Sequence, residues 1–357
     1  MQRTFLNKQV GQIIFIFVSL MPFIPFTAAA QIALLDEPIP LKPKEFYIAG
    51  VNDDRTDKSA TAQVAIKTTI EPTDLKGGTV EAVRQFIEHN LPKDQSLKPV
   101  VIDLKDLKLK ETILPNGSVD GHIQLHLSFG LQKNYGTEHL VDYNSGLHYV
   151  RRIDNVVTIE RNLHLLLVNG LVYFNDWMKA NADHNRKLAK NVKLIFTDYT
   201  EKTEGDTIYY SASRPLTWAD FQSHIRATSV FEAQVMPGFG YNQQAEMIKG
   251  TINVKIAVKT YVPKSACWAN YSGRDDYTLN HEQRHFDIVK IISDQFKQKI
   301  LDQKLTPDNF EAIINMQYLD SYRDMDAMQE AYDKETSHGT NRFAQGKWND
   351  RIDKELK

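Results

Sequence analysis

Cys267 is the only cysteine in this chain of 357 residues. No disulfide can therefore form within the chain, and the fold has to be stabilised by buried apolar surface. Apolar residues make up 42% of the sequence and charged residues 25%, the proportions of an ordinary soluble globular protein. A chain of this length can bury two separate hydrophobic cores, so we expect two globular domains without a covalent cross-link.

Residues 1–30 have the three parts of a secretory signal peptide. Arg3 and Lys8 precede an uncharged apolar run, which ends in a small-residue A-x-A pattern. Two prolines interrupt the run, so it is shorter than a helix that crosses a bilayer. We expect cleavage between Ala30 and Gln31, and a secreted or periplasmic protein without stable membrane insertion.

Changes in residue pattern divide the rest of the chain into three parts and predict the α+β class. Residues 31–75 are rich in Pro, Asp and Lys and have little periodicity, which predicts an irregular lead-in or linker. Residues 76–200 alternate apolar and polar side chains and predict a strand-rich N-terminal domain of unknown role. A polar stretch at 200–206 indicates a boundary. Residues 205–357 then predict a domain with a small sheet and two main helices.

Apolar periodicity places the individual elements. Alternation predicts strands around 100–104, 123–129, 140–150, 155–168, 192–196, 227–236 and 250–262. The helical period of 3.6 residues predicts helices over 78–92, 171–189 and 278–303, and a further one that opens at 306–308 and stops near Gly339.

The first long helix of the second domain carries His281-Glu282-Gln283-Arg284-His285. Helical residues four apart share a face, so His281 and His285 can present both imidazoles to one ion. Neutral imidazole suits zinc, and three protein ligands leave a fourth position for water. Glu282 could take a proton from that water and pass it to a leaving amine. This HExxH arrangement is typical of zinc peptidases, and an amphipathic helix, a preceding strand and a secretion signal favour it over two surface histidines.

The residues alone leave the third zinc ligand open. Neither Gly-x-x-His after His285 nor Glu-x-x-x-Asp on the next helix is present. His338 is the only later histidine, and it falls at the end of the second long helix, from which it could fold back over the first. Glu330, Asp333 and Glu335 are the carboxylate alternatives.

Three other positions have a functional and a structural interpretation. Tyr332 could donate to a developing oxyanion, but a helix-packing aromatic has the same pattern. Asp287 points to another helix face than His285, which indicates a group that supports the site or a surface charge. His122 and His126 lie on one strand and suggest a second metal site, although solvent-facing histidines explain them more simply.

Three ordered blocks of this sequence resemble the DUF922 family, bacterial proteins predicted to be secreted zinc-dependent proteases. Residues 281–288 resemble the family's HEQxHFDI signature, and residues 215–221 resemble its opening L-T-W-x-D-F segment. Residues 332–339, followed by Gln345 and Trp348, resemble its closing Y-D-x-x-T-x-H-G segment. The resemblance covers about 210–352 and does not extend to residues 31–200.

The resemblance implies a zincin-like domain in which His281 and His285 bind zinc, Glu282 is the base and His338 is the third ligand. We therefore expect a secreted zinc-dependent metallopeptidase that acts on a peptide or protein. The alternatives are a non-catalytic cell-envelope binding module with a structural or absent metal, and a zinc amidase acting on cell-wall peptides. Lys and Arg number 43 against 45 Asp and Glu without a basic run among aromatics, so nucleic acid is not an expected partner.

Overall fold

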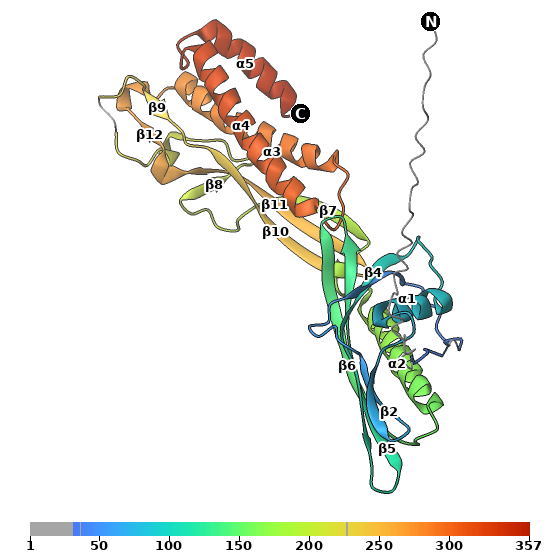
Figure 1. The fold of residues 1–357 in the computed structure, drawn as a ribbon. Helices are drawn as coiled ribbons and strands as arrows, with labels where there is room; N and C mark the ends of the chain where they lie inside the picture. The colour runs from blue at the N-terminus through green and yellow to red at the C-terminus, as the bar shows by residue number, and fades with distance from the viewer. Residues whose placement is uncertain (1–30, 36, 226–227) are drawn as a thin grey trace, which may run out of the picture.

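The computed structural model describes residues 31–35, 37–225 and 228–357. The signal peptide expected at residues 1–30 lies outside the described residues. Figure 1 shows two domains that follow one another along an elongated molecule, the first coloured blue to green and the second yellow to red. The α+β class and the strand-rich N-terminal region are confirmed. In the described part of the chain, no helix has both the length and the apolar character that a membrane span requires.

A six-stranded sheet with two helices makes up the N-terminal domain. Its strands are β1 (Phe46–Asp53), β2 (Ala62–Ile66), β3 (Thr69–Thr73), β4 (Lys98–Ile113), β5 (Ser118–Lys133) and β6 (Gly136–Arg152). Its helices are α1 (Thr79–Asn90) and α2 (Val157–Asn181). The strand order is β3-β2-β4-β5-β6, and β1 pairs in parallel with β4 beside β2. Alternate residues of β4 and β5 face α2, where Phe174 stacks on Phe129 at 4.1 Å between ring centroids.

Residues 31–75 are not an irregular lead-in, and this expectation was wrong. They carry β1, β2 and β3, which belong to the N-terminal sheet. Prolines and charged residues interrupt the apolar alternation there, so local periodicity is weak. Strand β4, about fifty residues further along the chain, pairs with β1 and β2, and β3 pairs with β2; this pairing supplies the missing order.

The expected helix over 171–189 was misplaced, and the expected strand over 155–168 was wrong. One helix, α2, occupies Val157–Asn181 instead. The run Leu163–Val168 is almost continuously apolar, which fits a buried strand as well as a buried helix. Packing of its buried face against the sheet decides in favour of the helix.

The C-terminal domain contains two sheets and three helices. A four-stranded sheet contains β7 (Asn191–Asp198), β8 (Thr207–Tyr209), β10 (Gly238–Ile248) and β11 (Thr251–Pro263), and a two-stranded sheet contains β9 (Ala233–Gln234) and β12 (Trp268–Ala269). The helices are α3 (Asp276–Leu301), α4 (Phe310–Thr336) and α5 (Arg342–Glu355). Because β7 pairs with β11, this domain begins before residue 205, earlier than expected. Helix α5 was not expected as an element, because only Gln345, Trp348 and Ile352 are buried in it.

Helix α3 packs against the sheet on one side and against two other helices on the other. Val289, Ile292, Phe296 and Ile300 pack with the buried side chains of β11. The opposite side of α3 is covered by α4 and α5, which Figure 1 shows lying against it. Its second turn, with His281, therefore lies between helices and not on open surface.

Candidate metal centre

The sequence-predicted histidines lie side by side on α3. Asp275 caps this helix by accepting a hydrogen bond from the backbone N–H of Thr278 at 2.7 Å. One turn further on, the His281 and His285 rings lie 4.9 Å apart between centroids and nearly perpendicular. His281 is buried at 6% exposure, which excludes a pair of surface histidines.

Asp333 of α4 is the third group at this point. Its Oδ1 lies 3.4 Å from His281 Nε2 and 3.0 Å from His285 Nε2. The three ligand atoms all lie within 4.8 Å of one another. The structure thus brings together both predicted histidines and one of the carboxylate alternatives.

Two glutamines fix which nitrogen of each imidazole carries the hydrogen. His281 Nδ1 lies 3.0 Å from Gln345 Oε1, and His285 Nδ1 contacts Gln329 Oε1. The amide nitrogens of these glutamines are engaged elsewhere, that of Gln329 with the His285 carbonyl oxygen at 3.1 Å. An amide oxygen can only accept, so each histidine donates from Nδ1, and in its neutral form it keeps the lone pair of Nε2 for a metal.

This donor set fits a divalent metal. Two Nε2 lone pairs face Asp333 Oδ1, which is buried and has no hydrogen-bond partner among the described residues. Burial would raise the pKa of Asp333, but without a metal the protonated forms of His281 and His285 outweigh it and hold that pKa well below its usual range. A cation between the three atoms would satisfy all of them, and two imidazoles with one carboxylate suit zinc.

Glu282 lies in the same cavity as the two histidines. Its side chain is 4% exposed, and its Oε2 accepts the backbone N–H of Val235 at 2.7 Å. Burial raises the pKa of Glu282, although the nearby histidines and the Val235 N–H oppose the rise. The cavity has a volume of about 620 Å³, and residues 230–235 and 337–340 are among those that line it.

His338 lines this cavity without joining the three clustered groups. Its Nδ1 lies 3.4 Å from Asp333 Oδ2, the oxygen that does not face the other histidines. The side chain is half exposed and its ring packs on Phe231 at 4.5 Å between centroids. Gly339 follows with φ +79°, and a Cβ there would lie 3.2 Å from His281, so the turn can approach His281 closely only with glycine.

Tyr332 is fully buried behind the histidines. Its hydroxyl donates to the His281 carbonyl oxygen at 3.2 Å and accepts from Gln345 Nε2 at 2.6 Å. Its ring stacks on His281 at 4.8 Å. These contacts match the packing interpretation, and Tyr332 is not among the residues that line the cavity.

The three sequence blocks meet around this site. Leu216 of the first block donates its backbone N–H to Gln283 Oε1 at 2.7 Å, and Gln283 Nε2 donates to Asp287 at 2.8 Å. Asp287 is buried and also accepts from Tyr210 and Arg284, so it supports α3 on the side away from the cavity. The last block, residues 332–339, supplies Asp333 together with Tyr332 and His338.

Gln329 was missed by sequence reasoning, and Gln345 was noticed without a role. The spacing offered one signal: Gln329 and Asp333 are four apart, on one face of α4. The packing of α4 in the tertiary structure turns this face toward His285, and no local sequence pattern indicates that orientation.

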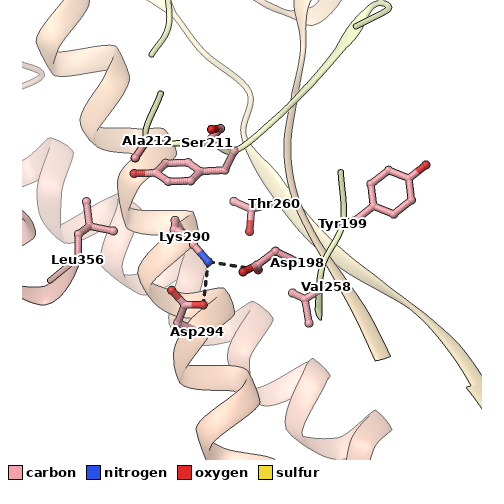
Figure 2. Close-up of a pocket in the computed structure, with 10 residues that line it drawn as sticks. Asp198, Tyr199, Ser211, Ala212, Val258, Thr260, Lys290, Asp294 and Leu356 are labelled. Atoms are coloured by element: carbon pink, nitrogen blue, oxygen red, sulfur yellow. Dashed lines mark hydrogen bonds and ion pairs between the residues drawn. The ribbon is translucent and has the colours of Figure 1, made fainter. Parts of the chain in front are cut away.

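A second cavity of about 370 Å³ lies between the sheet and α3. Figure 2 shows Lys290 reaching both Asp198 and Asp294, at 3.2 and 2.9 Å. These charges are paired with one another, and the cavity contains none of the predicted site residues. It therefore supplies no competing candidate for the site.

Comparison with known proteins identifies no matching family model and no matching curated protein. A crystal structure of a Xanthomonas campestris protein, described as family DUF330, is 7% identical over 43% of this chain and 98% of its own, with a TM-score of 0.29. A minor lipoprotein from Acinetobacter baumannii is 12% identical over 26% of this chain and 69% of its own, with a TM-score of 0.16. Neither likeness is close enough to carry a conclusion about fold or function.

Proposed function

We propose that this protein is a zinc-dependent metallopeptidase of the HExxH type. The observation that carries the proposal is the convergence of His281 Nε2, His285 Nε2 and the unpaired Asp333 Oδ1 beside Glu282 in one cavity. We further propose that the chain is exported, on the signal-peptide pattern of residues 1–30, and that it is related to DUF922, on the three sequence blocks.

His281, His285 and Asp333 would hold the zinc. A zinc ion bound there supplies a Lewis acid, which acidifies water and polarises a peptide carbonyl. Three protein ligands beside an open cavity leave room for water and substrate, which is the arrangement of a catalytic site and not of a closed structural one. His338 contacts the outer oxygen of Asp333 and would orient that carboxylate.

Glu282 is the proposed general base. The Val235 N–H occupies its Oε2, which leaves Oε1 to take a proton from water and deliver it to the leaving amine. A carboxylate whose pKa is raised by burial is a better base near neutral pH than an exposed one. Tyr332 holds the backbone and ring of His281 in place and has no proposed part in proton transfer.

Glu282→Gln separates catalysis from metal binding. The glutamine oxygen can still accept the Val235 N–H, so the variant should fold and retain one zinc at this site. Hydrolysis of casein should fall by roughly 10²–10⁴-fold, because the proton acceptor is lost.

Hydrolysis of purified cell-wall fragments but not casein by the wild-type protein would favour an amidase. A wild-type protein without zinc after reconstitution would contradict the proposal.

The third ligand is tested by Asp333→Ala beside His338→Ala. Elemental analysis should find the zinc of this site lost from the Asp333 variant and retained in the His338 variant, because only Asp333 faces both Nε2 atoms. The reverse result would assign the position to His338, as the family resemblance implies.

A further inference from the structure

A second group of metal-ligand side chains lies on the N-terminal sheet. Asp120 and His122 are two apart on β5 and therefore share a face, and His148 on β6 is the direct register partner of His122. Asp120 Oδ1 lies 2.5 Å from His148 Nε2, and Asp120 Oδ2 lies 3.3 Å from His122 Nε2. The two imidazole rings are 4.6 Å apart between centroids.

We propose that Asp120, His122 and His148 form a second metal site that binds Zn²⁺. One ligand atom from each residue lies within 4.8 Å of the others. Tetrahedral zinc with bonds of about 2.0–2.1 Å places its ligand atoms roughly 3.3 Å apart, so small side-chain movements complete the site. Both histidines direct Nε2 at the Asp120 carboxylate. The three ligand atoms therefore converge on one point, as the ligands of a single zinc ion must.

The strand pairing makes the site rigid. His122 and His148 are opposite each other in a ladder of antiparallel strands, which fixes the spacing of their backbones. The histidine side chains are 62% and 57% exposed, so an ion can reach them and water can complete its coordination. Lys110 on β4 lies opposite His122 and adds one positive charge nearby. We therefore expect a micromolar and not a nanomolar affinity.

The pairing corrects the sequence pattern that suggested His122 with His126. Four residues along a strand separate these two histidines by roughly 13 Å, too far for one ion. His126 is opposite Asn144 and does not belong to the cluster. The real partner, His148, is 26 residues further along the chain and becomes a neighbour only through the β5–β6 register.

This site is independent of the centre on α3. The last residue of β5, Lys133, contacts Asp308 of the C-terminal domain. Asp120 is at the other end of β5, roughly 40 Å away for an extended strand. The two sites can therefore be emptied separately.

The test uses the mature full-length chain with His281→Ala and His285→Ala, so that only the second site can report. Equilibrium dialysis against excess zinc should find one zinc per chain, and calorimetric titration should give a micromolar Kd. Adding His122→Ala or His148→Ala should weaken binding at least tenfold. His126→Ala, on the same strand and face, should leave it unchanged, and circular dichroism should show the same fold in all variants.

The wild-type background provides a second measurement in case the parent variant fails to fold. There, zinc content should fall from two per chain to one with His148→Ala. If only the proposed peptidase site fails to bind zinc, the wild-type protein should contain one zinc per chain, and His148→Ala should remove it. Zinc content and affinity that do not respond to His122→Ala or His148→Ala in either background would overturn the proposal.

Discussion

At the scale of single residues, the candidate centre depends on side chains that do not touch the metal position. Gln345 and Gln329 each accept the Nδ1 hydrogen of one histidine and so direct Nε2 toward Asp333. Such outer partners set both the tautomer and the ring orientation of a ligand. The site is therefore an assembly of α3, α4 and α5 and not a property of the five-residue motif.

Gln345→Leu should weaken zinc binding at the α3 centre by about 10–100-fold, because His281 loses the acceptor that fixes its tautomer. Competition with a chelating indicator measures this in a His148→Ala background. Gln298→Leu, on the exposed end of α3, is the matched control and should have no effect. Equal affinity in both variants would show that Gln345 does not orient His281.

Cys267 should be chemically inert in the folded protein. Its side chain is 1% exposed, its Sγ–H donates to the Pro263 carbonyl oxygen at 3.2 Å, and burial raises its pKa to about 11. A thiol reagent at pH 8 should find no reactive group in the native state and one per chain in denaturant. Rapid labelling of the native protein would contradict this prediction.

At the scale of elements, the segment 215–221 shows how a short motif holds the centre in place. Asp220 Oδ2 accepts from Thr217 N and Thr217 Oγ1 at 2.7 and 2.9 Å, and Arg214 pairs with the same carboxylate. This turn fixes Leu216, whose N–H holds Gln283. The motif therefore acts through local backbone geometry and not through direct contact with the metal ligands.

Asp220→Asn should lower the free energy of unfolding at pH 7 by roughly 1.5–3 kcal/mol, the range for hydrogen bonds to a charged group. Burial raises the pKa of Asp220, but Arg214 and Thr217 outweigh it and hold that pKa below its usual range. A depressed folded-state pKa gives stability that is present above the unfolded value and is lost as the pH falls through the folded value.

The difference in free energy of unfolding between wild type and Asp220→Asn, measured in urea, should therefore be largest at pH 7. It should shrink below about pH 3.9, the pKa of Asp in the unfolded chain. Asp350→Asn, at an exposed position of α5, is the control and should change little at either pH. A difference that stays constant from pH 7 to the acid range would mean that the ionised carboxylate is not the stabilising group.

At the scale of the whole molecule, the hydrophobic clusters of the two domains are separate from each other, and polar contacts link the domains. One core lies between the N-terminal sheet and α2, and another between β11 and α3. Ion pairs such as Lys133–Asp308 and Arg186–Glu311 link the domains. Pairs of this partly exposed kind contribute about 0–1 kcal/mol each, so the domains should be weakly coupled.

Calorimetry of the metal-free protein should show two unfolding transitions. Phe174→Ala and Phe296→Ala remove fully buried rings from the first and second core, and each should cost its own domain about 3–5 kcal/mol. Each variant should lower one transition temperature and leave the other nearly unchanged. A single transition shifted by both variants would show that the domains unfold as one cooperative unit.

The α+β class, the extent of α3 and the shared face of His281 and His285 could be predicted from the sequence alone. These features depend on periodicity and on spacing within one element, which neighbouring residues encode. The expected helix over 278–303 accordingly differs by two residues at each end from α3 at Asp276–Leu301.

Only the tertiary structure decided which distant groups meet. Asp333 and Gln345 reach the histidines because α4 and α5 pack on α3, and His148 reaches His122 because β5 and β6 pair in one register. Strands β1 and β2 likewise acquire order from β4. Such contacts arise from the free energy of burying whole faces of helices and sheets, which no stretch of local sequence specifies.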